Sequence, residues 1–249
     1  MIRTDQIRIN YKLTFKAPFL FGIGLRKGLI HRTASRDAKG YLYVPGSTIK
    51  GVLRERCEHL ARLFNLKIRA PHGERSALAE FNPNASLVDR IFGSRFRPGR
   101  LYFDDASMSQ EDQALFDGEQ EPKRYLDKQI QQRTQVSISR LTHTARPEFL
   151  YTSEFGLHYL HFEGQIYGWL QDFSLPDDSR GTYASLLLLA GLCSLDRLGG
   201  NKSTGAGQFT WEILKLQING EMQQRDTWLE KLVDLEYYEI AQGLEQGES

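Results

Sequence analysis

The sequence has few cysteines and no long apolar run. Its 249 residues include two cysteines, Cys57 and Cys193, which are too few for a disulfide framework. No apolar stretch reaches the length that spans a bilayer, and residues Met1 to Gln6 lack the apolar core of a signal peptide. Hydrophobic residues make up 40% and charged residues 25% of the chain, a balance typical of globular proteins. We expect a cytoplasmic protein that is not associated with membranes.

Signals for metal or nucleotide chemistry are also scarce. Cys57, His59 and His72 lie within a short span, but structural zinc needs four closely spaced ligands and no second cysteine pair follows. The order GxxxxGK[ST] of a phosphate-binding P-loop is absent, and the glycine-rich loop near residue 200 follows a predicted helix rather than a strand. We therefore expect no metal site and no resident cofactor, although a divalent metal ion is compatible with RNA cleavage.

The net charge is only +1, but the two signs are separated along the chain. Residues 25–69 hold eleven basic and three acidic side chains, whereas the last part of the chain is strongly acidic. The basic residues are Arg26, Lys27, Arg32, Arg36, Lys39, Lys50, Arg54, Arg56, Arg62, Lys67 and Arg69. A near-neutral total therefore does not exclude a phosphate-binding face.

The pattern of apolar residues predicts the fold class. Alternation from Ile7 to Phe15 predicts a strand with one buried face. Helical spacing from Ile49 to Phe64 predicts a helix that has Ser47 as its N-cap. Further strands are predicted at residues 100–106, 157–170 and 208–216, and a leucine-rich helix at about 183–198. This β-α-β-β-α-β order is that of an α+β, ferredoxin-like (RRM-like) core.

We expect one domain over residues 1–249, because no low-complexity linker interrupts the chain. An insertion at about 107–156 is predicted to form a long hairpin, and residues from about 222 to 249 are predicted to form an amphipathic helical tail.

Lys50 is unusual because it falls in the first turn of the first predicted helix. A cation there costs stability unless an anion lies nearby. Arg54 lies one turn further on the same face. The pair indicates a track for a sugar-phosphate backbone, and the alternative is an ordinary surface pair whose neighbour Glu58 forms a simple ion pair.

Residues 198–207 form a glycine-rich loop between the second helix and the last strand. Glycine allows a ligand to approach the backbone, and free N–H groups beside Lys202, Ser203 and Thr204 are suited to a phosphodiester. The alternative is a helix C-cap followed by a flexible connection.

Basic and apolar residues are interleaved in the insertion. An apolar fingertip can wedge between bases while arginines hold phosphates. The alternative is a solvated surface hairpin. The residues concerned are Lys123, Arg124, Lys128, Arg133, Val136, Ile138, Arg140, Leu141, Arg146, Phe149 and Tyr151.

Five segments, in this order, resemble the RAMP superfamily, and most closely the repeated backbone subunit of type III CRISPR effectors. They cover about Ile7 to Leu216. The segments are Val44-Pro-Gly-Ser-Thr-Ile-Lys-Gly51, Arg90-Ile-Phe-Gly-Ser94, Gly99-Arg-Leu-Tyr-Phe-Asp-Asp-Ala106, Ile138-Ser-Arg-Leu-Thr-His-Thr-Ala-Arg-Pro147 and Leu198-Gly-Gly-Asn-Lys-Ser-Thr-Gly-Ala-Gly207.

The resemblance implies binding of a guide RNA (crRNA) and its paired target RNA, contact with other effector subunits, and stacking of copies or relatives into a filament. The insertion would be a thumb laid across the duplex of a neighbouring subunit. The implied guide contacts are Ser47, Lys50, Arg54, Gly199, Gly200, Asn201, Lys202, Ser203, Thr204 and Gly205, and the implied thumb contacts are Arg140, Leu141, Thr142 and Arg146.

The resemblance also bears on catalysis. Active members carry an aspartate, in the loop after the first strand, that supports cleavage of the target RNA. Here His31 stands at that position, and Asp37 matches a neighbouring aspartate with a structural role. Histidine can act as a general base. The expectation is an RNA scaffold with impaired or altered cleavage. A target-RNA endoribonuclease that cuts at regular intervals and a terminal capping subunit remain alternatives.

Overall fold

The computed structural model describes residues 1–22, 30–68, 85–94, 98–117, 125–176 and 181–246. Side chains are described in these ranges except at residues 147–149 and 244–246.

The main sheet is antiparallel and is built around two long strands, β1 (Ile2–Phe15) and β8 (His161–Phe173). Its order is β10-β9-β1-β8-β5-β3, and β4 also pairs with β8. The fold is therefore a mixture of helices with antiparallel sheet, as the sequence predicted. The other strands are β3 (Tyr43–Val44), β4 (Leu101–Phe103), β5 (Ala106–Met108), β9 (Phe209–Ile218) and β10 (Glu221–Met222).

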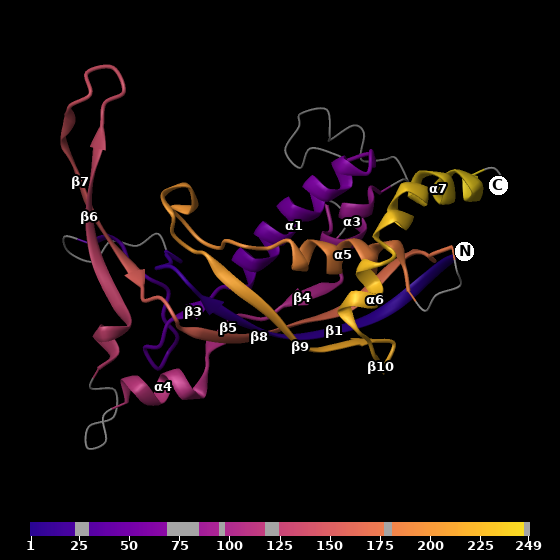
Figure 1. The fold of residues 1–249 in the computed structure, drawn as a ribbon, viewed down its shortest axis with the longest axis horizontal. Coiled ribbons are helices and arrows are strands. Elements are labelled where there is room, and N and C mark those ends of the chain that lie inside the picture. Colours follow the sequence, from indigo (N-terminus) through magenta and orange to yellow (C-terminus); the bar gives the residue numbers. More distant parts are fainter. Residues whose placement is uncertain (23–29, 69–84, 95–97, 118–124, 177–180, 247–249) are drawn as a thin grey trace.

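One face of this sheet is covered by three helices, α1 (Gly46–Leu63), α3 (Leu87–Phe92) and α5 (Tyr183–Cys193), as Figure 1 shows. The odd-numbered residues of β1 from Ile7 to Phe15 point into this layer and are buried, which confirms the predicted alternation. The opposite face of β1 holds Arg8 and other polar side chains.

Several predicted boundaries were wrong, among them that of the strand predicted at 157–170, which runs from His161 to Phe173. Helix α1 begins at Gly46 with Pro45 as its N-cap, so Ser47 is the second residue of the helix and not its cap. Helix α5 ends at Cys193 rather than near residue 198, because Ser194 bonds back to the carbonyl of Gly191 through its hydroxyl. The strand predicted at 100–106 is two strands, β4 and β5.

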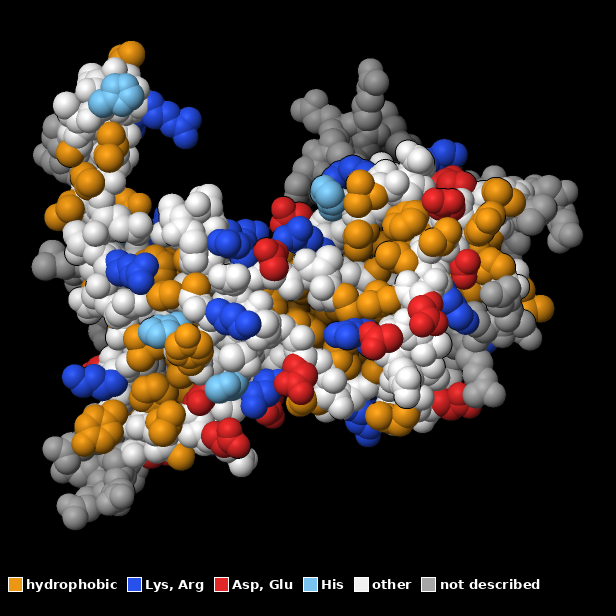
Figure 2. Space-filling view, in the orientation of Figure 1, with side chains coloured by type: hydrophobic (Ala, Val, Ile, Leu, Met, Phe, Trp, Pro, Cys, Tyr) orange, Lys and Arg blue, Asp and Glu red, His pale blue; other side chains and the backbone are white. Residues whose placement is uncertain are grey.

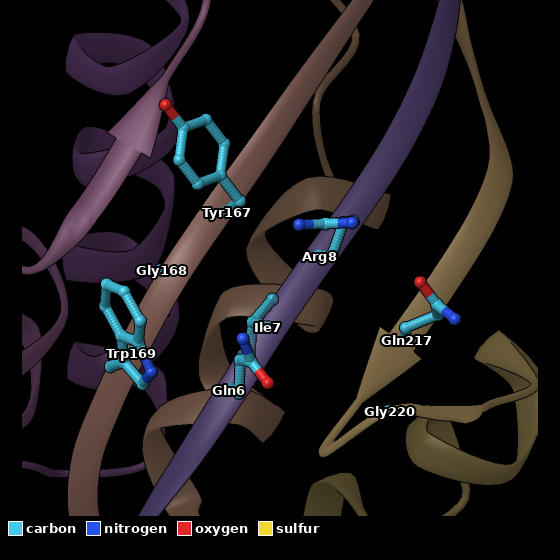
Figure 3. A pocket seen from close by; sticks show the side chains of 8 residues that line it. All are labelled: Gln6, Ile7, Arg8, Tyr167, Gly168, Trp169, Gln217 and Gly220. Atoms are coloured by element: carbon cyan, nitrogen blue, oxygen red, sulfur yellow. The ribbon is translucent and has the colours of Figure 1, made fainter.

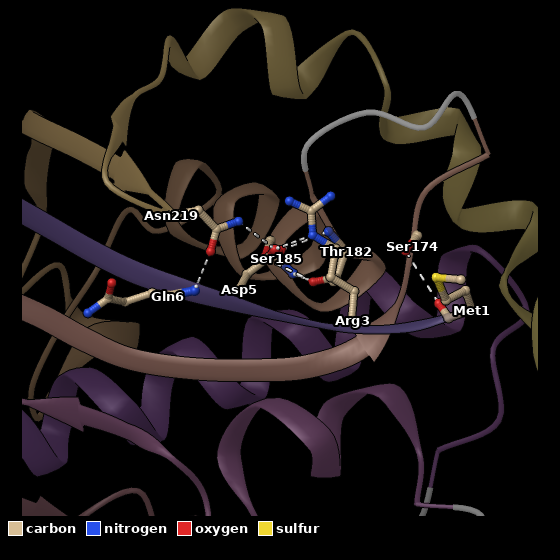
Figure 4. Close-up of polar contacts among 8 residues, drawn as sticks. All are labelled: Met1, Arg3, Asp5, Gln6, Ser174, Thr182, Ser185 and Asn219. Carbon is tan, nitrogen blue, oxygen red and sulfur yellow. Dashed lines mark hydrogen bonds and ion pairs between the residues drawn. The ribbon is translucent and has the colours of Figure 1, made fainter.

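A buried carboxylate joins β1 to the start of α5. Asp5 accepts hydrogen bonds from the Thr182 N–H at 2.9 Å and from the Ser185 hydroxyl at 2.7 Å, and Asn219 donates to its other oxygen at 3.1 Å. Figure 4 shows these side chains converging from three parts of the chain. A negative charge at a helix N-terminus is stabilising, so Asp5 fixes the position of α5 on the sheet.

A second sheet of three strands, in the order β2-β7-β6, projects from the body. Strands β6 (Ile130–Ile138) and β7 (Ala145–Gly156) form a long antiparallel hairpin. The short strand β2 (Ile30–Arg32) pairs in parallel with the base of β7. Helix α4 (Gln110–Phe116) and the 3-10 turn η1 (Leu126–Gln129) precede the hairpin.

The last part of the chain packs back onto the body. It forms α6 (Arg225–Leu229), the 3-10 turn η3 (Leu232–Tyr237) and α7 (Tyr238–Gln246). Trp228, Leu235 and Tyr238 are buried in the main core, and the Tyr238 ring lies 5.4 Å from that of Tyr183 in α5.

Tyr238 also lies against a buried acid, Asp172, on β8. The Tyr238 hydroxyl and the Arg90 Nε both lie 3.5 Å from the Asp172 Oδ1. Burial raises the pKa of Asp172 from 3.8 to about 7, although Arg90 acts in the opposite direction. This acid therefore binds its proton more tightly in the folded chain than in the unfolded chain.

We expect this proton to make stability depend on pH. A carboxyl whose pKa is raised by folding stabilises most below its unfolded pKa, and that contribution is lost as pH rises through the folded value. Between pH 4 and 7 the free energy of unfolding should fall by up to about 1.4 kcal/mol per pH unit through this group. Chemical unfolding of Asp172→Asn should show a flatter pH profile, whereas Asp196→Asn, an exposed aspartate, should follow the wild type. Parallel profiles for wild type and Asp172→Asn would contradict this.

Candidate nucleic-acid interface

The N-terminus of α1 is already capped by a carboxylate. The Gly46 N–H donates to the Asp105 Oδ1 at 2.7 Å, and a Cβ at Gly46 would overlap with the Phe103 carbonyl. Ser47 is exposed, and the Lys50 ammonium lies 5.9 Å from the Phe103 ring. Asp105 thus supplies negative charge at the helix N-terminus, where the sequence predicted a bound phosphate. Two adjacent acids, Asp104 and Asp105, were the signal in the sequence, and reasoning from local patterns missed it.

Arg54 is engaged inside the protein. Its guanidinium contacts Glu58 and Asp89, each at 3.0 Å, and donates to the Gly93 carbonyl at 2.7 Å. The side chain is 23% exposed. These contacts hold α3 against α1, and they confirm the simple ion pair with Glu58. A contact between Arg54 and the guide stays a prediction. The guanidinium that would make it already has three partners within the protein.

The charge of the basic stretch is partly neutralised in the described residues. Within the described residues, several of its members pair with acids that are remote in sequence. Arg26, Lys27 and Arg69 lie outside the described residues, as do Lys123 and Arg124 of the insertion. The remote pairs are Arg36 with Glu154, Arg56 with Asp196 and Lys67 with Glu239.

The glycine-rich loop lies between α1 and the hairpin (Figure 1). The Lys202 Nζ is 3.7 Å from the Glu55 Oε2 of α1, and the Asn201 Nδ2 is 3.3 Å from the Gln135 Oε1 of β6. Residues Lys202–Thr204 form the 3-10 turn η2, and Ser203 and Thr204 are exposed. The loop therefore connects two of the predicted RNA-binding elements.

Hydrogen bonds within the protein hold this loop in shape. The N–H groups of Leu198, Gly200 and Gly207 donate to the carbonyls of Gly207, Leu20 and Pro18. Those of residues 204, 205 and 206 donate to carbonyls of the loop itself. These six N–H groups are not directed at a ligand, so the predicted phosphate cradle has fewer free donors than expected. The polar side chains of the loop remain at the surface.

The hairpin exposes apolar side chains with no core behind them. Leu141 in its turn is 91% exposed and Ile138 is 60% exposed. Arg140 and Thr142 are exposed beside them, and so is Arg146 at the start of β7. Figure 2 shows apolar and basic side chains together at this end of the molecule. Exposed apolar side chains grouped in this way indicate contact with another molecule.

His31 and Asp37, the two candidate catalytic residues, make different contacts in the structure. The His31 Nδ1 accepts the Thr152 N–H at 3.3 Å, at the base of the hairpin. This contact engages Nδ1 with the backbone of β7 and leaves Nε2 as the other ring nitrogen. Asp37 accepts from the N–H groups of Lys39 and Tyr41 at 2.8 and 2.9 Å. Asp37 thus closes its own turn, which agrees with a structural role.

No three His, Cys, Asp or Glu side chains come together as metal ligands in the described part of the chain. Cys57 is buried in α1, its Sγ 3.6 Å from the Leu187 carbonyl, and His72 lies outside the described residues. Among the described helices none has the length and apolar character needed to cross a membrane.

These features define an α+β protein with an antiparallel sheet and a projecting hairpin. The RAMP superfamily model matches residues 12–210, most of the chain, and the protein belongs to the RAMP superfamily. A similar solved structure is "Cryo-EM structure of the Type III-B Cmr-beta bound to cognate target RNA", with a TM-score of 0.53 at 11% identity over 82% of this chain and 96% of that chain. Identity this low shows a shared fold alone. No curated protein matches the chain in sequence.

Proposed function

We propose that this protein is a guide-RNA-binding backbone subunit of a type III CRISPR ribonucleoprotein used in antiviral defence, which holds the crRNA and its paired target RNA. The observation that carries the proposal is the continuous surface from α1 through the glycine-rich loop to the hairpin, joined by the contacts of Lys202 with Glu55 and of Asn201 with Gln135. Membership of the RAMP superfamily supports it, and so does the similar fold in a type III-B complex bound to target RNA.

The strand order also supports a ferredoxin-like core. Strands β9, β1, β8 and β4 are neighbours in that order, with α1 and α5 on one face, which is the arrangement expected of a β-α-β-β-α-β chain. We treat residues 1–249 as one domain that carries a thumb at about 107–156 and a helical tail from about 222.

The hairpin has the side chains that a thumb needs. Leu141 and Ile138 are suited to wedge between bases, while Arg140 and Arg146 are suited to hold phosphates. Its projection from the body points to a neighbouring subunit as the place where it acts (Figure 1). Copies or relatives of the chain would then stack along one guide, with base pairing supplying sequence specificity.

We propose a scaffold rather than a ribonuclease, because His31 stands where the resemblance places a catalytic aspartate, and its Nδ1 is engaged by the Thr152 N–H. The test is to purify the complex with its guide and to incubate it with labelled complementary RNA. A bound guide with uncut target is expected. Cuts at regular intervals would contradict the scaffold, and absence of any guide would contradict the proposed function.

Lys50→Glu is expected to weaken binding of the guide roughly tenfold and to reduce the slope of log Kd against log salt by about 0.7, the value for one phosphate contact with a single strand. At this end of α1 the Lys50 ammonium lies 5.9 Å from the centroid of the Phe103 ring. Fluorescence anisotropy with labelled guide RNA at several salt concentrations measures both quantities.

Lys231→Glu is the matched control, because Lys231 is also half-buried but lies in the acidic tail. Equal loss of affinity in both variants would show that only overall charge matters and would remove α1 from the interface.

A further inference from the structure

The face of the main sheet opposite α1 and α5 carries aromatic rings. Tyr167 and Trp169 project from β8, and Tyr102 projects from the neighbouring strand β4, where it is paired with Tyr167. The Tyr102 and Tyr167 rings are stacked with centroids 5.5 Å apart. Tyr102 is 53% and Trp169 46% exposed. Large aromatic surfaces exposed side by side on a sheet indicate a binding site for another molecule.

This face also has a hollow and polar side chains suited to a ligand. The hollow has a volume of about 450 Å³. In register, Arg8 of β1 is opposite Tyr167 and Gln6 is opposite Trp169, so a cation and an amide stand beside the rings. Figure 3 shows these side chains pointing to the same side of the sheet, with helices behind it. The lining residues are Gln6, Ile7, Arg8, Tyr167, Gly168, Trp169, Gln217 and Gly220.

The cations near the rings are available for a ligand. Within the described part of the chain, neither Arg8 nor the exposed Arg100, which precedes Tyr102, has an ion-pair partner. Of the acids on this face, Glu163 and Glu212 are opposite Lys12 in register, further along β1, whereas the exposed Asp104 lies two residues beyond Tyr102. The end of the face that holds the rings therefore carries two cations, Arg8 and Arg100, and one acid, Asp104.

We propose that this uncovered sheet face binds unpaired RNA, with bases stacked on Tyr167 and Trp169 and phosphates held by Arg8 and Arg100. Aromatic side chains on a sheet stack on splayed bases, and amides such as those of Gln6 and Gln217 can bond base edges or 2′-hydroxyls. A duplex is excluded as the occupant because its bases are already stacked and unavailable to the rings.

The site goes beyond the guide interface. Helix α1, which includes Lys50, lies on the helix-covered side of the sheet, whereas the rings lie on the opposite side. One chain then holds two RNA segments, with the guide on one side and an unpaired strand on the other.

The test uses the full chain carrying Lys50→Glu, so that the guide interface is weakened, and labelled oligouridylate as the probe. Tyr167→Ala and Trp169→Ala should each weaken binding by about tenfold, within the range found for loss of one base–aromatic stack. Trp169→Phe, which keeps a ring, should bind nearly as the parent does. Tyr237→Ala, a similarly exposed tyrosine in η3, is the matched control.

A second measurement does not depend on the alanine variants folding well. Oligouridylate should quench the tryptophan fluorescence of the wild type, and the quenching should disappear in Trp169→Phe, because Trp228 is buried in the core and Trp211 packs against the core with its ring stacked on Tyr11. Affinity and quenching that are unchanged by substitutions at residues 167 and 169 would overturn the proposal. The proposal would also be overturned if the complex that contains Trp169→Ala lost a protein subunit but kept its RNA, because the ring would then contact protein.

These outcomes are separable from those of the guide interface. Trp169→Ala should leave the co-purified guide in place, while Lys50→Glu should reduce it. Absence of a guide from the wild-type complex, with oligouridylate still bound by the chain, would count against the proposed function and leave the sheet site standing.

Discussion

Arg54→Glu lowers the free energy of unfolding by about 3 kcal/mol, because removing one partner of a largely buried ion pair leaves the other charge uncompensated. The Arg54 guanidinium donates hydrogen bonds to Glu58, to Asp89 and to the carbonyl of Gly93. A glutamate in its place would put a third carboxylate among two others and would loosen α3 from α1. Urea unfolding followed by circular dichroism measures the change.

Arg62→Glu is the matched control for this substitution. Arg62 lies on the same helix and its guanidinium is 3.8 Å from Glu58, but its side chain is 61% exposed. Exposed pairs contribute about 0 to 1 kcal/mol, so this variant should unfold nearly as the wild type does. If both variants lost equal stability, the contacts of Arg54 would contribute no more to the free energy of unfolding than an exposed ion pair does. The result also matters for RNA binding, because charge reversal at Arg54 perturbs the fold and only Lys50→Glu tests the interface cleanly.

Gly207→Ala should destabilise the protein by more than about 3 kcal/mol and dislodge the glycine-rich loop, because it combines backbone strain with overlap that the core cannot relieve. Gly207 has a φ of +74°, and a Cβ there would overlap with the Leu198 carbonyl. That carbonyl belongs to a residue whose own N–H donates to Gly207. Thermal unfolding together with guide-RNA affinity measures both consequences.

Gly205→Ala separates the two causes. Gly205 also has a positive φ, +89°, but a Cβ there would meet nothing within 4 Å. Only the left-handed backbone then opposes alanine, at a cost of about 1 to 2 kcal/mol. Equal destabilisation of the two variants would show that overlap with Leu198 is unimportant.

Local periodicity was sufficient to predict the main elements. The alternation from Ile7 to Phe15 and the helical spacing from Ile49 to Phe64 are properties of single segments, and both elements form. Their limits were less predictable, since β1 extends back to Ile2 only because it continues to pair with β8, where Ile2 is opposite Phe173. Pairing of strands so distant in sequence leaves no local signal.

The candidate site was harder to predict for the same reason. Three contacts that redefine it join residues far apart in the chain: Asp105 with Gly46, Asp89 with Arg54, and Glu154 with Arg36. Charge counted along the sequence predicted a cationic stretch, but the acids that neutralise it come from other elements. The motifs of the RAMP superfamily identified the family, while the roles of their residues depend on these remote partners.

The internal hydrogen bonds of the glycine-rich loop affect how RNA can bind. Because six of its N–H groups are already bonded within the protein, the loop loses its conformational entropy when the chain folds and not when RNA arrives. The turn of the hairpin is also held by hydrogen bonds, from the Ser139 N–H to the Thr144 carbonyl and from the His143 N–H to the Ser139 carbonyl, but the Leu141 side chain there is 91% exposed. An RNA strand would therefore meet a preformed loop at one end of the surface, whereas at the other end the Leu141 side chain would lose its conformational freedom only on binding.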